Sequence, residues 1–181
     1  MRILALLCVF VFPAAAQTSP PAVPAEIQAL LDAHDYPKAE LAIQQKLSAS
    51  PAWERGHVLL AQIYNTTARY ALAERSGLAA VSRRESVDAF LVLAVATMNL
   101  RKLNESIDWL EKAAKWQPRN PEIYRLLGLD YALGGMLRES EEAFRQGMEI
   151  APELGAALFG RPRALRTREI VGFRKSVPAC N

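Results

Sequence analysis

The feature that most constrains the fold of this chain is a residue pattern that recurs after 34 positions. The first copy comprises Phe90, Leu93, Ala94, Ser106, Leu110, Ala113, Trp116 and Pro118, and the second comprises Tyr124, Leu127, Gly128, Ser140, Phe144, Gly147, Ile150 and Pro152. Two further copies precede these in the sequence. Leu60 lies 33 positions before Leu93, and Ala39 lies 34 positions before Ala73. A fixed period of this size is typical of chains that stack one repeated unit.

Each copy of the pattern has the apolar spacing of two helices. Small residues such as Ala94 and Gly128 stand where two helices approach closely, and a large side chain there would hold the helices apart. Asn120 and Pro121 are typical of a helix start. Gly134 and Gly135 can adopt the left-handed backbone that ends a helix. The pattern predicts an all-α fold, a right-handed α-solenoid of about four helix-turn-helix hairpins.

The period and these residue types resemble the tetratricopeptide repeat family over about residues 20–154. The match is strongest in the last unit, at Tyr124, Leu127, Gly128, Tyr131, Phe144 and Pro152. It is weakest in the second unit, where Gly77 occupies a bulky position and Glu85 a proline position. We expect units at about 20–53, 54–86, 87–120 and 121–154, within a solenoid that spans 17–154.

The first 16 residues have the pattern of a secretory signal peptide. Arg2 precedes an apolar run from Ile3 to Phe12, and Ala14 and Ala16 place small residues before Gln17. The run is too short to span a bilayer, which takes about 20 residues. We expect cleavage before Gln17 and export to the periplasm or the cell exterior.

Positive charge gathers after residue 155. Arg161, Arg163, Arg166, Arg168, Arg174 and Lys175 face a single acidic residue, Glu169. We expect residues 155–181 to form a partial capping helix and a basic tail. The tail offers one alternative function, peripheral association with an anionic membrane.

No local signature of catalysis is present. The sequence has no glycine-rich phosphate loop, no paired-histidine metal motif and no cysteine pair, and its two histidines are His34 and His57. The aromatic residues mostly coincide with packing positions of the repeat. We therefore expect no enzyme activity, no cofactor, no metal and no nucleic-acid partner.

The resemblance implies that the first helix of each hairpin lines a concave face that binds a protein or peptide. The repeat register assigns to this face a groove comprising Arg55, Val58, Gln62, Asn65, Leu91, Val95, Met98, Asn99, Arg125, Leu129 and Leu133, with Thr66, Asp88 and Glu122 beside them. Some family members hold a peptide's terminal carboxylate with basic side chains on this face. Val58 and Leu91 stand where such a residue would be needed, so we expect no carboxylate clamp.

The leading hypothesis is a scaffold that binds a partner segment or helix in this groove. A second hypothesis is an accessory, non-catalytic subunit of an envelope enzyme or assembly system. A further alternative is that part of the groove packs against the chain's own ends, since solenoids need terminal caps.

Overall fold

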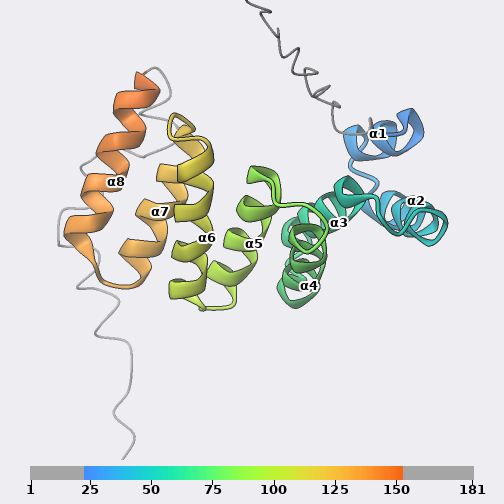
Figure 1. Ribbon diagram of the computed structural model, residues 1–181, viewed down its shortest axis with the longest axis horizontal. Coiled ribbons are helices and arrows are strands. Elements are labelled where there is room, and N and C mark those ends of the chain that lie inside the picture. The colour runs from blue at the N-terminus through green and yellow to red at the C-terminus, as the bar shows by residue number, and fades with distance from the viewer. Residues whose placement is uncertain (1–22, 153–181) are drawn as a thin grey trace, which may run out of the picture.

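A computed structural model describes residues 23–152 of the chain, which form eight α-helices and no strand (Figure 1). The helices are α1 (Ala25–Asp32), α2 (Tyr36–Ala49), α3 (Glu54–Thr66), α4 (Tyr70–Val81), α5 (Val87–Asn99), α6 (Leu103–Trp116), α7 (Pro121–Leu133) and α8 (Leu137–Ile150). The predicted all-α hairpin architecture is confirmed. The expected signal peptide and the segment 155–181 lie outside the described residues.

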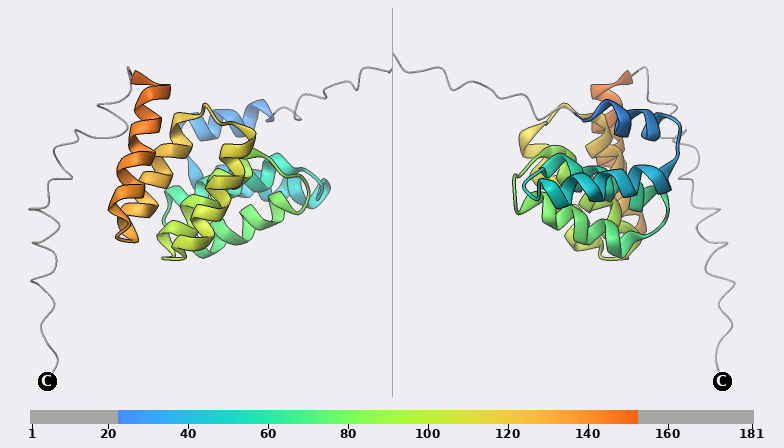
Figure 2. Two further views of the ribbon diagram at one scale, coloured as in Figure 1. Left: turned by 60° about the vertical axis from the view of Figure 1, so that its left-hand side comes forward. Right: turned by 90° about the vertical axis from the view of Figure 1, so that its right-hand side faces the viewer.

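The helices pack as four successive hairpins along the long axis of the molecule. Each odd-numbered helix packs on the helix that follows it, and α4 and α6 also pack on α5 and α7 of the next hairpin. Figure 2 shows α8 and α2 at opposite ends of this stack. Among the eight described helices, none is long and apolar enough to cross a membrane.

Each hairpin turns through one residue with left-handed backbone. These residues are His34 (φ 56°), Ala68 (φ 56°), Arg101 (φ 63°) and Gly135 (φ 77°), and they occupy equivalent positions in the four repeats. The left-handed conformation expected at the glycine pair is confirmed for Gly135 alone, because Gly134 has φ −82°. The other three turns carry a side chain in a conformation that favours glycine.

The largest buried side chains gather around α5, at the centre of the stack. Eight of its 13 residues are buried, and Phe90 and Leu93 are among the most deeply enclosed. Phe90 also packs edge-on against Trp116 and in a stacked arrangement against Trp109 of α6. The central position of α5 therefore follows from an almost continuous apolar sequence, which must be covered on more than one side.

The weakest copy of the repeat has a specific packing explanation. A Cβ atom on Gly77 would lie 2.7 Å from Cγ of Leu93, so α5 occupies the space that the bulky side chain fills in other units. Helix starts follow ordinary capping chemistry, as at Asn120, whose side chain accepts a hydrogen bond from the Glu122 amide at 3.1 Å. The absence of a side chain at Gly77 thus lets α4 lie close to α5, the central helix of the groove described next.

Candidate functional site

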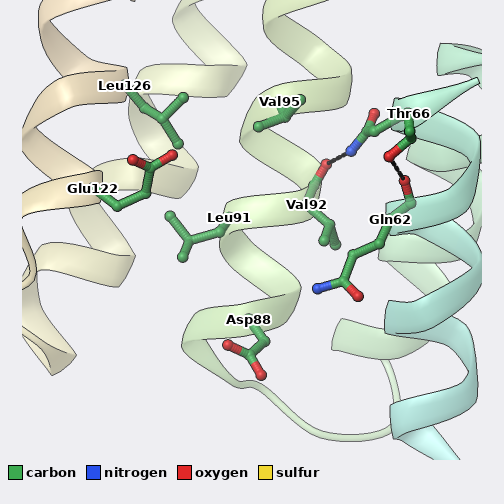
Figure 3. A pocket seen from close by; sticks show the side chains of 9 residues that line it. Gln62, Thr66, Asp88, Leu91, Val92, Val95, Glu122 and Leu126 are labelled. Atoms are coloured by element: carbon green, nitrogen blue, oxygen red, sulfur yellow. Dashed lines mark hydrogen bonds between the residues drawn. The ribbon is translucent and has the colours of Figure 1, made fainter. Parts of the chain in front are cut away.

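A groove lies between α3, α5 and α7, and we call it the α3/α5/α7 groove. It has a volume of about 250 Å³ and is lined by Gln62, Asn65, Thr66, Asp88, Leu91, Val92, Val95, Glu122 and Leu126 (Figure 3). Three successive odd-numbered helices supply its walls, as expected for the inner face of stacked hairpins.

The groove combines apolar and charged side chains. Leu91 and Val95 of α5 and Leu126 of α7 lie around the open space (Figure 3). The Glu122 carboxylate lies between Leu126 and Leu91, and Asp88 lies toward the start of α5. On the opposite wall, α3 contributes the side chains of Gln62 and Asn65. An apolar strip with hydrogen-bonding and charged groups beside it suits a peptide whose apolar side chains are anchored on the strip.

Two arginine–carboxylate pairs border the groove. Arg55 of α3 forms an ion pair with Asp88 Oδ2 of α5, and so links two hairpins. Arg125 binds both carboxylate oxygens of Glu122 within α7, at 2.6 and 2.7 Å. The hydrogen bond to Glu122 raises the pKa of the Arg125 guanidinium, so the arginine stays charged.

Asn65 holds α3 against α5. Its side-chain amide donates to the backbone carbonyl of Val92 at 2.9 Å, while its Oδ1 atom is buried and has no hydrogen-bond partner among the described residues. A buried amide oxygen without a donor is uncommon in proteins. Asn65 is therefore both a structural contact and a free acceptor at the groove wall.

Four of the eleven predicted groove residues line the groove: Gln62, Asn65, Leu91 and Val95. Arg55 and Arg125 lie at its border through their ion pairs with Asp88 and Glu122. Asn99 is exposed and donates to the Val95 carbonyl of its own helix at 2.8 Å. The lining does not include Met98, Leu129 or Leu133, and Leu133 is exposed at the end of α7.

Val58 requires a correction, because the structure places it in the core. The side chain is fully buried in a cluster with Ala61, Ala80, Ala89 and Val92. The small Ala89 at the start of α5 lets that helix cover the face of α3 on which Val58 lies. Register alone assigned Val58 the same environment as Leu91, its equivalent in the next repeat.

Two lining residues, Val92 and Leu126, were absent from the predicted set. They lie 34 positions apart and so share one repeat position. The repeat register could therefore have identified them as a pair that lines the same surface. Val92 is 6% exposed and Leu126 is 3% exposed, so they form the floor of the groove more than its walls.

Within residues 23–152, no group of three or more His, Cys, Asp or Glu side chains is arranged to hold a metal ion. Among the described carboxyl groups, the strongly perturbed one is that of Asp130 of α7, which is buried against α5 and α6 outside the groove. Burial raises its pKa to about 6.

Comparison with known proteins agrees with this architecture. The family model of the tetratricopeptide repeat matches residues 87–120, which contain α5 and α6. No curated protein matches the chain in sequence.

Several solved structures have the same fold. A crystal structure of MamA is 21% identical over 84% of this chain and 93% of its own, with a TM-score of 0.67. MamA from Desulfovibrio magneticus RS-1, residues 41 to the end, is 20% identical over 70% of this chain and 72% of its own, with a TM-score of 0.66. YrrB, described as a TPR protein with an unusual peptide-binding site, is 19% identical over 77% of each chain, with a TM-score of 0.62. At these identities the similarity establishes the fold.

Proposed function

We propose that this chain, which has one matched tetratricopeptide repeat and the fold of such proteins, is a non-catalytic scaffold that binds a partner protein in the α3/α5/α7 groove. The observation that carries the proposal is the apolar strip of Leu91, Val95 and Leu126 around the open space, with polar side chains beside it. Apolar anchors in such a strip supply binding energy, and bordering polar groups fix the orientation of the bound segment.

The structural neighbour YrrB is described as having a peptide-binding site, which supports a bound segment of protein as the class of ligand. The open side of the groove suits an extended segment or one face of an amphipathic helix. A small-molecule substrate would need a more enclosed site with convergent polar groups.

Substitutions on the groove wall test this function. Leu91→Asp places a charge in the apolar strip, and Gln62→Lys changes an exposed side chain on the opposite wall with little effect on folding. A partner purified with the parent chain should bind each variant at least tenfold more weakly. Leu78→Asp is the matched control, because Leu78 is 47% exposed on α4 and does not line the groove. If the parent and both groove variants bound the partner equally well, the proposed function would be wrong.

We also propose that residues 1–16 direct export and that the scaffold works in the periplasm or outside the cell. Support comes from the sequence of the segment, with its short apolar run and the small residues before Gln17. Intact mass measurement of the protein from an exporting host should show a chain that begins at Gln17. A full-length chain retained in the cytoplasm would contradict export.

A further inference from the structure

We propose that the chain's own basic segment, residues 161–175, is an occupant of the α3/α5/α7 groove and competes there with the external partner. The inference rests on the proposed function, because it takes the groove to be a peptide-binding surface. Charge, apolar content and the path of the chain at the end of α8 each support it.

Charge complementarity is the first support. Outside the core, the three helices that line the groove carry three carboxylates, those of Glu54, Asp88 and Glu122. Only two arginines, Arg55 and Arg125, stand on the same helices. The segment 161–175 has six cationic side chains and one acidic residue. Opposite net charges of this kind favour association of the two surfaces.

The two carboxylates at the groove remain accessible to a further cation. The side chains of Asp88 and Glu122 are 54% and 40% exposed. Arg55 binds Asp88 through Oδ2, so Oδ1 is left to accept from another donor. A guanidinium group, with its planar set of donors, suits a carboxylate that is already held in place.

The segment also has the apolar side chains that the groove needs. Leu165, Ile170, Val171 and Phe173 are interspersed among its arginines. The groove presents Leu91, Val95 and Leu126 among its polar side chains. A solvated charge run would gain nothing from that strip, whereas a mixed basic and apolar segment buries apolar area there.

The path of the chain places this segment within reach. A short turn at 134–136 reverses the chain, so the end of α8 lies beside the start of α7, where Glu122 is found (Figure 1). Residues 153–162 can span up to about 33 Å when extended. The groove begins on α7 itself and ends on α3, and neighbouring helices lie about 8 to 10 Å apart. The connection is therefore long enough for the segment to cover the groove of the same molecule.

A nitroxide on Cys180 measures this proximity in the full chain. With Cys8→Ser, Cys180 is the single thiol and stands five residues beyond Lys175. We expect the label to reduce the methyl resonances of Leu91 and Leu126 at least twofold. The methyl resonances of Leu41 and Leu78, exposed leucines on α2 and α4, should keep their intensity. The paired change Arg166→Glu and Arg168→Glu should restore the groove signals, as should about 0.5 M salt, which screens exposed charges within a few Å.

Three results would overturn the proposal. The first is no loss of intensity at the groove, or an equal loss at all four leucines. The second is a loss that appears only between labelled and isotope-enriched chains mixed together, because the occupant would then be a second copy. The third is no loss at the groove together with binding of the segment to phosphatidylglycerol vesicles that the arginine changes abolish, because the partner would then be a membrane.

Partner binding separates this inference from the proposed function. If both hold, the Arg166→Glu and Arg168→Glu chain binds the partner more tightly than the parent, and Leu91→Asp weakens binding. Weaker binding by Leu91→Asp with no nitroxide effect at the groove rejects the intramolecular occupant alone. Unchanged binding by every groove variant rejects the function itself.

Discussion

Asp130 is the residue whose surroundings differ most from those of its equivalents. The preceding repeats have Ile63 and Ala96 at this position, both in the core. Asp130 is fully buried, with Oδ2 2.5 Å from the Ser106 hydroxyl, and that hydroxyl lies 2.8 Å from the Ala94 carbonyl oxygen. A hydroxyl has one proton and can donate to only one of these oxygens. A protonated Asp130 donates to Ser106, which then donates to Ala94, so the neutral carboxyl completes the chain of hydrogen bonds.

The carboxyl of Asp130 should make the stability depend on pH. Burial raises its pKa to about 6 from the usual 3.8 of an aspartate, so the folded state holds the proton more tightly than the unfolded state. The stabilisation is complete below pH 3.8 and is lost as the pH rises through 6. At about 1.4 kcal/mol per pKa unit, the ionised group costs about 3 kcal/mol above that range. Asp130→Asn should recover most of this at pH 8 and little at pH 3.5, measured by urea unfolding.

The comparison between the two variants controls for other titrating groups, because every other carboxylate is common to both chains. Asp130→Ala reproduces the side chain of Ala96 and should also flatten the pH dependence. If the parent and Asp130→Asn differ equally at both pH values, the proton is not held at this site.

The left-handed turn residues give a second prediction at this scale. Ala68 and Gly135 occupy equivalent positions with φ of 56° and 77°, and a Cβ on Gly135 would contact nothing within 4 Å. The strain of a side chain in this conformation is therefore isolated from packing. Ala68→Gly should stabilise the fold by about 1 kcal/mol, and Gly135→Ala should destabilise it by a similar amount. Thermal unfolding of both variants measures the two changes, and shifts of the same sign would contradict the explanation.

At the helix crossings of the last two hairpins, the sizes of the two facing side chains are complementary. A Cβ on Gly128 of α7 would lie 2.5 to 2.8 Å from three ring atoms of Phe144 on α8. The equivalent positions in the preceding hairpin hold Ala94 and Leu110, both fully enclosed in the core. A larger residue on one helix accompanies a smaller one on its partner, which keeps the two helices close.

Gly128→Ala should therefore destabilise the α7–α8 hairpin. Overpacking against the ring costs about 1 to 3 kcal/mol, while the gain in helix propensity offsets about 1 kcal/mol. Adding Phe144→Leu to Gly128→Ala reproduces the Ala94 and Leu110 pair. The double variant should lose less stability than the sum of the losses in the two single variants. Urea unfolding of the four chains gives the coupling, and strict additivity would show that the two positions do not share space.

The sequence predicted those features of the fold that depend only on residues within one repeat. The helices, the cap at Asn120 and the small residues at crossings depend on neighbours less than one unit away. The places of Val58 and Gly77 depend on α5 of the next repeat, which covers Val58 and fills the space at Gly77 with Leu93. The turn residue Ala68 also gave no signal, because its left-handed backbone is imposed by the hairpin.

Across the whole molecule, successive hairpins are joined by equivalent ion pairs. Glu40 of α2 binds Arg69 at 2.7 Å, and Glu74 of α4 binds Lys102 at 2.6 Å. The sequence does not continue this series, because Ile107 and Met136 stand at the next pair of positions. Partly exposed pairs contribute little to stability, up to about 1 kcal/mol each. They fix the angle between neighbouring hairpins more than they hold the stack together.

Burial is uneven along the stack, so its stability should be uneven too. The buried residues of α1 and α2 are Ile27, Ala39 and Ile43, whereas α5 alone has eight. In a linear stack each hairpin is stabilised by its own contacts and by its nearest neighbours. The α1–α2 hairpin has a neighbour on one side only and a small core. It should therefore unfold locally while the other described hairpins stay folded.

Two matched isoleucine changes test this gradient. Ile43 of α2 and Ile123 of α7 are both fully buried, and Ile→Val at either costs about 0.5 to 1.5 kcal/mol. Hydrogen exchange should show lower protection of α1 and α2 alone in Ile43→Val, because that hairpin opens locally. In Ile123→Val the loss should extend over α5 to α8, because α7 shares one core cluster with α5 and α6. A uniform loss of protection in both variants would mean that the four hairpins unfold as one cooperative unit.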